Sequence, residues 1–231
     1  MHLPAFLDLV RARRATRRFR AERLPGGVLD ELLDAARWAP SGYNLQPTRF
    51  VLVKDAAAKT RLRRACMGQP QITEAPVTVV LCGDTQVVAR NFDDVLRQDK
   101  EAGALSDEYE GMLRKFVPLA FATAPLGLGW LAKAFLLPVV GLFTPIPEFP
   151  AVHRRRWLAK QVSLSAMNLM LAATAAGLAT CPMEGFSERF VRKAVSLPRG
   201  LVPLIVVPLG YAADPPGSKT RLPLARLVSG A

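Results

Sequence analysis

Residues that bind metals or form catalytic nucleophiles are scarce in this sequence, which has three cysteines and two histidines in 231 residues. Cys66, Cys82 and Cys181 are odd in number and none has C-x-x-C spacing, so no disulfide framework is predicted. His2 and His153 lie far apart, and neither belongs to an H-x-x-x-H pair. The sequence therefore supports neither a zinc site nor a Ser-His-Asp or Cys-His catalytic group.

The sequence also gives no indication of a targeting signal or a membrane-spanning segment. The first ten residues lack a basic region followed by a long apolar run, so we expect no signal peptide and a cytoplasmic protein. The longest proline-free part of the most apolar stretch, Leu126–Leu137, has 12 residues. A membrane-spanning helix needs about 20, which argues against a transmembrane segment.

Acidic residues are few. The sequence has 19 aspartates and glutamates but 31 lysines and arginines, which gives a net charge of +12. A basic protein attracts nucleotides, phosphates, anionic lipid or nucleic acid. The arginines are spread over 11–23, 61–64, 154–156 and 189–199 rather than gathered in one tail. No zinc-knuckle, RNP or basic-zipper pattern is present, so nucleic acid is not an expected partner.

Hydrophobic periodicity predicts helices and strands in alternation, which favours an α/β or α+β fold. The predicted helices cover 6–14, 28–38, 56–65, 85–101, 153–176 and 187–195, and the predicted strands cover 50–53, 77–82 and 201–211. Gly177 is expected to end the longest helix. We find no internal repeat and no linker, and we therefore expect a single domain over residues 1–231.

One apolar stretch, 117–147, carries a single charge, Lys133, and is interrupted by five prolines. We interpret it as part of an unusual insertion at about 117–150. It packs in the core or on a second copy, forms a lid, or makes a peripheral contact with a membrane. The segment 127–132 matches G-x-G-x-x-A, but no strand is predicted before it, so we do not expect a dinucleotide site there.

Two polar motifs are candidates for a ligand site. Arg13-Arg14-Ala15-Thr16-Arg17-Arg18 carries four guanidiniums, which bind phosphate in bidentate fashion. If the first helix continues, Arg13 and Arg17 share a face; the alternative is a solvated basic helix end. The second motif, residues 39–47, is a turn between a helix and a strand, and its hydroxyl, amides and backbone N–H groups are suited to a pocket.

Four segments of the sequence resemble motifs of the FMN-dependent nitroreductase family. They are the two motifs above, R-R-A-T-R-R-F and A-P-S-G-Y-N-L-Q-P, together with T-C-P-M-E-G-F at 180–186 and K-T-R-L-P-L at 219–224. The four segments are in the family's order. The resemblance implies an α+β nitroreductase-like fold with a central mixed or antiparallel sheet flanked by helices. It also implies an intertwined homodimer in which the C-terminal tail crosses onto the second copy.

The resemblance further implies the residues that contact FMN. From the arginine segment these are Arg13, Arg14, Ala15 and Arg17, of which Arg17 approaches the N1/O2 edge. Lys219 and Arg221 complete the phosphate site, and the loop contributes Pro40, Ser41, Asn44 and Gln46. Gln69 is predicted at the pyrimidine edge, and Pro182, Met183, Glu184 and Gly185 over the ring near N5. Ala15 is a departure, because the family often has Ser there.

The implied activity is ping-pong oxidoreduction, in which NADH or NADPH reduces FMN at N5 and a nitroaromatic or quinone accepts the electrons. No protein side chain is expected to be catalytic. Two alternatives remain open. One is a specialised member of the superfamily, such as a reductive dehalogenase or a flavin-modifying enzyme. The other is a non-catalytic flavin-binding or membrane-surface protein, with 117–147 as the membrane contact.

Overall fold

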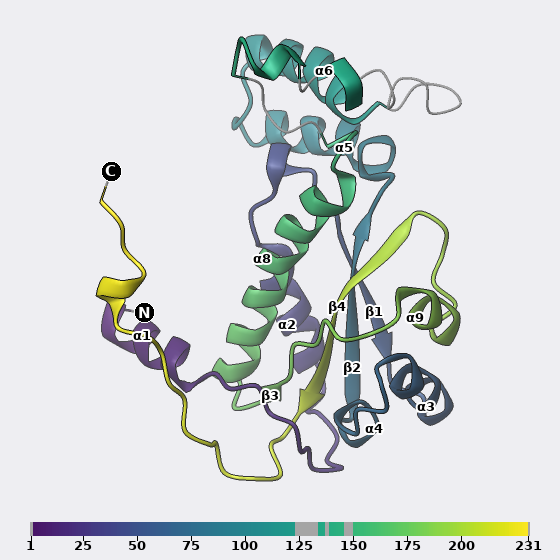
Figure 1. Cartoon of the computed structure of the whole chain (residues 1–231), viewed down its shortest axis with the longest axis vertical. Helices are drawn as coiled ribbons and strands as arrows, with labels where there is room; N and C mark the ends of the chain where they lie inside the picture. Colours follow the sequence, from purple (N-terminus) through teal and green to yellow (C-terminus); the bar gives the residue numbers. More distant parts are fainter. Residues whose placement is uncertain (1, 123–133, 137–138, 146–149, 231) are drawn as a thin grey trace.

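A computed structural model of the protein describes residues 2–122, 134–136, 139–145 and 150–230 (Figure 1). Its centre is a four-stranded antiparallel sheet with the strand order β1-β2-β4-β3. The strands are β1 (Thr48–Val53), β2 (Val77–Asp84), β3 (Ala179–Thr180) and β4 (Leu201–Gly210). The predicted α+β class is confirmed, and the three predicted strands form.

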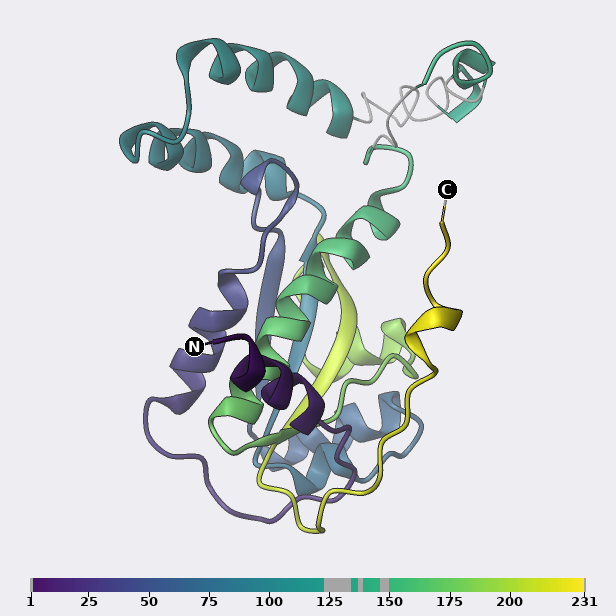
Figure 2. The same ribbon diagram turned by 90° about the vertical axis from the view of Figure 1, so that its left-hand side faces the viewer.

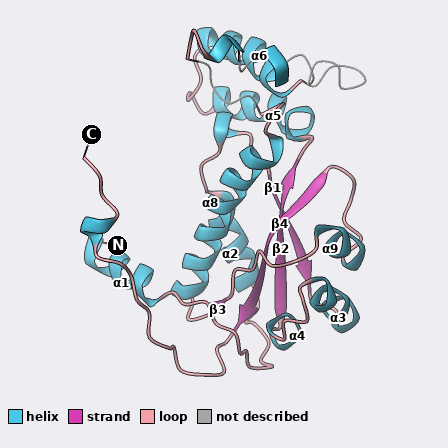
Figure 3. Ribbon diagram, viewed as in Figure 1, coloured by secondary structure: helices cyan, strands magenta, loops and turns pink. Residues whose placement is uncertain are grey.

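Both faces of the sheet are covered by helices, as Figure 3 shows. One face packs against α2 (Val28–Arg37) and α8 (Arg154–Ala175), and the other against α3 (Ala56–Ala65), α4 (Gln71–Glu74) and α9 (Glu188–Ala194). All eight residues of β2 are buried. Its side chains alternate between the two cores, with Val79 beside α8 and Val80 on the α3 side. A strand buried on both faces has to be apolar almost throughout, which explains its sequence.

Helices α5 (Val87–Glu101) and α6 (Asp107–Phe121) extend from one end of the sheet (Figure 2). Helix α6 was not predicted, although the Ser106 Oγ accepts a hydrogen bond from the Tyr109 N–H at its start. The helix continues through Pro118, so the first residues of the apolar 117–147 stretch belong to it, and Val117 and Phe121 are buried. The G-x-G-x-x-A segment at 127–132 lies outside the described residues.

Exposed apolar side chains follow in the described parts of that stretch, and 75% of Phe135 and 85% of Phe143 are accessible. None of the helices in the described ranges is long and apolar enough to cross a bilayer. The membrane contact predicted for 117–147 therefore stays a prediction.

The first helix begins and ends earlier than the predicted 6–14, because α1 (Leu3–Ala12) stops before the arginine segment. Arg13 already has an extended backbone, with φ −54° and ψ 131°. The reason is that Ala15 forms a parallel bridge with Thr180, and the Thr16 N–H donates to the Thr180 carbonyl at 2.9 Å. The prediction that Arg13 and Arg17 share a helix face is wrong.

The end of α8 follows the prediction more closely. Gly177 has φ +70°, and its N–H donates to the Thr174 carbonyl at 3.1 Å. A left-handed glycine after the last helical residue turns the chain back into β3. The chain finishes in a long tail that contains one short 3-10 turn, η3 (Leu224–Arg226).

Candidate flavin site

The arginine segment and the tail meet, although some 200 residues separate them in the chain. Residues 13–18 and 214–221 line a hollow of about 510 Å³. The Arg14 Nε donates to the Gly217 carbonyl at 3.2 Å, and the Lys219 Nζ donates to the Arg13 carbonyl at 3.1 Å. Four predicted residues thereby come together, and we call Arg13, Arg14, Lys219 and Arg221 the cation cluster.

The cation cluster has an excess of positive charge. Partial loss of hydration lowers the pKa of the Lys219 ammonium below its ordinary value. The positive charges of Arg13, Arg221 and Arg14 lower that pKa further. Within the described part of the chain, the buried Arg13 Nη1 has no hydrogen-bond partner. A buried, unpartnered guanidinium nitrogen among cations is suited to a bound anion such as a phosphate.

The predicted 182–185 segment lies beside β4 and close to the cation cluster. Met183 pairs with Val206 through two backbone hydrogen bonds of 2.9 and 3.0 Å, which fixes the backbone of the segment. Pro182, Glu184 and Gly185 remain exposed. A Cβ added at Gly185 would meet only the Gln69 Nε2, at 3.9 Å, so the surface there is open. The structure thus places Gln69 beside this segment.

Two neighbours of the segment extend the site. Burial raises the pKa of the Cys181 thiol, while the charges of Arg17 and Arg13 lower it, which places both guanidiniums near the sulfur. The Thr180 Oγ1 is buried and has no hydrogen-bond partner among the described residues. The sequence analysis did not predict Thr180 as a site residue. Thr180 lies between Ala15 and the 182–185 segment, which were both predicted to contact FMN, and this position could have identified it.

The loop at residues 39–47 has an unusual backbone. Tyr43, Asn44 and Gln46 have φ values of 57°, 51° and 51°, a region that residues other than glycine rarely adopt. Backbone strain of this kind concentrates at functional sites. Ser41 supports the loop from within, because its Oγ accepts a hydrogen bond from the Gln46 N–H at 2.9 Å.

Two residues that were not predicted hold the loop from outside. The Gln161 Oε1 on α8 accepts from the Gly42 N–H at 2.9 Å, and the Asp99 Oδ1 on α5 accepts from the Asn44 Nδ2 at 3.0 Å. Gly42 packs closely against α8, because an added Cβ would lie 3.2 Å from the Trp157 Nε1 and the indole would have to shift. Pro40, Ser41 and Gln46 line a second hollow, of about 170 Å³.

The loop and the cation cluster lie at opposite ends of α8 (Figures 1 and 2). Gln161, which holds the loop, is fourteen residues before the last residue of α8, a distance of about 21 Å along the helix. Thr180, which pairs with the arginine segment, follows the far end of that helix. The predicted residues that the structure describes therefore form two groups in one chain. One group contains the cation cluster, Ala15, Arg17, Gln69 and 182–185, and the other contains the residues of the 39–47 loop.

Comparison with known proteins identifies the family. The sequence model described as the Nitroreductase family matches residues 10–211. The chain belongs to the nitroreductase family. The match contains the arginine segment, the 39–47 loop and the 180–186 segment of this nitroreductase-family chain, and ends before K-T-R-L-P-L at 219–224.

Individual relatives cover nearly the whole chain. An NADH dehydrogenase of Thermus thermophilus is 32% identical over 94% of this chain and 91% of its own. A Bacillus subtilis protein named as an NAD(P)H nitroreductase is 27% identical over 96% of each chain. A protein of Exiguobacterium sibiricum, solved in complex with FMN, has the same fold, with a TM-score of 0.73 at 20% identity over 98% and 97% of the two chains.

Proposed function

We propose that this nitroreductase-family chain is an FMN-dependent oxidoreductase that uses NADH or NADPH as its electron donor. The observation that carries the proposal is the cation cluster, in which the buried Arg13 Nη1 has no partner among the described residues. The names of the Thermus thermophilus and Bacillus subtilis relatives and the FMN complex of the Exiguobacterium sibiricum protein support it.

The cation cluster holds the phosphate of FMN in this proposal. The Arg14 side chain is already held by the tail through its hydrogen bond to the Gly217 carbonyl, so little of its side-chain entropy is lost when an anion binds. Lys219 and Arg221 add charge from the tail. After loss of hydration, the positive charges of Arg13, Arg221 and Arg14 contribute to the lowered pKa of Lys219, so a bound anion reduces the repulsion among these cations.

The flavin ring lies against the 182–185 segment, where Gly185 leaves an open surface beside Gln69. FMN supplies hydride chemistry at N5, which no side chain of this protein can provide. Arg17 approaches the N1/O2 edge, where a positive charge stabilises the reduced flavin. The donor and the acceptor use the same open surface in turn, and a nitroaromatic or quinone is the acceptor.

A homodimer completes the site. The outward faces of α1, α8 and the tail expose ten large apolar residues: Leu3, Phe6, Leu7, Val10, Leu164, Met167, Leu222, Leu224, Leu227 and Val228. A hollow of about 670 Å³ lies among them, lined in part by Phe6, Val10 and Met167. A second copy that covers this surface brings its own 39–47 loop to the cation cluster, which the 21 Å separation prevents within one chain.

The absorption spectrum of the purified protein tests the proposal, recorded before and after anaerobic addition of NADH and then NADPH. A flavin band that bleaches, and returns when a quinone or nitroaromatic is added, is the expected result. A flavin band that persists with both donors favours a flavin-binding protein or a specialised member of the superfamily. A protein that binds no FMN, even when FMN is added, contradicts the proposal.

A further inference from the structure

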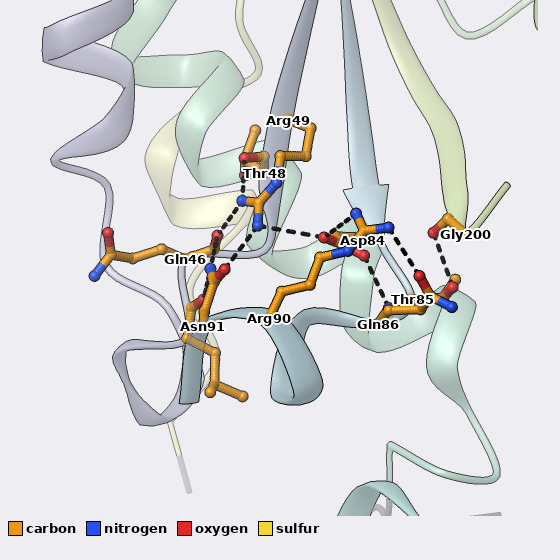
Figure 4. Close-up of polar contacts among 10 residues, drawn as sticks. Gln46, Thr48, Arg49, Asp84, Thr85, Gln86, Arg90, Asn91 and Gly200 are labelled. Carbon is orange, nitrogen blue, oxygen red and sulfur yellow. Dashed lines mark hydrogen bonds and ion pairs between the residues drawn. The ribbon is translucent and has the colours of Figure 1, made fainter. Parts of the chain in front are cut away.

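A buried carboxylate lies next to the 39–47 loop, at the end of β2. The side chain of Asp84 is fully buried, with the Arg90 Nη1 at 3.0 Å and the Arg49 Nη2 at 3.3 Å. Its Oδ1 also accepts a hydrogen bond from the Gln86 N–H at 2.8 Å. Figure 4 shows the two guanidiniums converging on this carboxylate. A buried charge with two charged partners and a backbone donor fixes the orientation of those partners.

Arg49 connects this carboxylate to the loop (Figure 4). Its Nη1 donates to the Gln46 carbonyl at 3.0 Å, and its Nη2 donates to the Asn91 Oδ1 at 2.8 Å. The Asn91 Nδ2 in turn donates to the carbonyls of Leu45 at 2.8 Å and Gln46 at 3.2 Å. Two side chains, one from β1 and one from α5, therefore hold the Leu45 and Gln46 carbonyls of the loop.

The loop needs such support because its backbone is strained. Asn44 and Gln46 are in the left-handed region, which is unfavourable for residues with a Cβ. Their side chains are nevertheless the ones predicted to contact FMN. The donors that bind the Leu45 and Gln46 carbonyls stabilise the loop in this strained conformation.

We propose that Asn91 and Arg49, oriented by the buried Asp84, are positioning residues that hold the loop in its FMN-binding conformation. The inference rests on the proposed function, since it concerns the same cofactor site. Neither Asn91 nor Asp84 belongs to the motifs of the sequence, and both act through the loop rather than on FMN.

Titration of the apo dimer with FMN tests this proposal, with Asn91→Ala compared with Asn168→Ala. Asn168 is a matched control, because it is half-buried and its Nδ2 donates to the Ala35 carbonyl at 3.2 Å, away from the loop. Loss of two hydrogen bonds to the loop is expected to raise the Kd for FMN about 5- to 30-fold in Asn91→Ala. Asn168→Ala is expected to keep the wild-type Kd.

A second variant separates the two roles of Asn91. Asn91→Asp keeps the oxygen that accepts from Arg49 but loses the amide donors to the loop, so its Kd is expected to rise as in Asn91→Ala. The visible circular dichroism of bound FMN is expected to change in both Asn91 variants and to stay unchanged in Asn168→Ala. A purely structural role lowers the urea midpoint without changing this spectrum.

The outcomes are distinct. If wild-type protein binds FMN and Asn91→Ala matches Asn168→Ala in Kd and spectrum, the inference is wrong while the proposed function stands. If Asn91→Asp binds FMN as wild type does, the amide donors do not position the loop, and the inference is again wrong. If wild-type protein binds no FMN, both are overturned.

Discussion

Lys219 donates a hydrogen bond to the backbone carbonyl of Arg13 at 3.1 Å, across 206 positions of the chain. The same ammonium donates to the Val10 carbonyl at 3.2 Å, at the end of α1. The tail is therefore attached where the first helix stops and the arginine segment begins. This contact brings two basic segments together, and it produces the cation cluster that we assign to phosphate.

The first prediction concerns the unpartnered guanidinium. Arg13→Ala is expected to raise the Kd for FMN about 10- to 100-fold, because charge-assisted hydrogen bonds to an anion are among the stronger ones in proteins. Fluorescence titration of the apo protein measures this, and raising the salt concentration is expected to narrow the difference from wild type.

Arg64→Ala is the matched control, since it removes the same charge from the exposed side of α3, on the other face of the sheet. It is expected to leave the Kd within about twofold of wild type. Equal effects of Arg13→Ala and Arg64→Ala would show that net charge, rather than the cation cluster, governs binding.

The second prediction concerns the homodimer. Met167 is 47% exposed on α8 and lines the hollow in the apolar surface that we propose is covered by a second copy. Met167→Glu is expected to convert the dimer into a single chain of 25.2 kDa, because it buries an unpaired charge in the interface. Light scattering after size-exclusion chromatography measures the mass, and FMN affinity is expected to fall in parallel.

Phe190→Glu provides the comparison, because Phe190 is 58% exposed on α9, which packs on the opposite face of the sheet from α8. It is expected to stay dimeric. A wild-type protein that is monomeric at micromolar concentration would contradict the dimer outright.

The third prediction concerns packing where the chain leaves β4. A Cβ added at Gly210 would lie 2.5 Å from the Pro76 Cδ, a rigid ring atom that cannot turn aside. Gly210→Ala is therefore expected to destabilise the fold by about 1–3 kcal/mol, measured by urea unfolding. Gly111→Ala, in the middle of α6 with nothing within 4 Å of its added Cβ, is expected to stabilise it by about 0.5–1 kcal/mol.

The fourth prediction concerns pH. Burial raises the pKa of the Cys66 and Cys82 thiols to about 12, from an ordinary value of 9.0. The unfolded chain therefore loses these protons first, and stability falls as the pH rises from about 9 towards 12. Urea unfolding across this range is expected to show a shallower decline for Cys66→Ala than for wild type. Parallel declines would mean that the buried Cys66 thiol does not contribute to the pH dependence.

Local patterns in the sequence predicted much of the fold. The strand β2 was predicted from its continuous apolar run, and the long helix α8 from a helical pattern of apolar and small residues. Helix α6 was missed because Pro118 and the apolar residues around it obscured the helical period, although Ser106 and three acidic residues begin the helix well. The end of α1 was wrong because the bridge between Ala15 and Thr180 opposes local helix propensity.

The candidate site was predicted in its residue types but not in its arrangement. The motifs identified Arg13, Ser41, Glu184 and Arg221 because guanidiniums, hydroxyls and exposed loops carry chemical meaning wherever they lie. They could not identify Asn91, Asp84 or Gln161, because an amide within an ordinary helix, or a carboxylate at the end of a strand, has no local signature. These residues matter only through what the fold places next to them.

The sequence by itself determined the charge excess, the polar motifs and the apolar periods of the main elements, because each depends on residues close together in the chain. Only the tertiary structure decided that Lys219 meets Arg13, that Asp84 orients Arg49, and that the 39–47 loop and the cation cluster lie at opposite ends of α8 (Figure 1). Contacts across such long separations depend on how the helices and strands pack, and the packing is set by the whole chain at once.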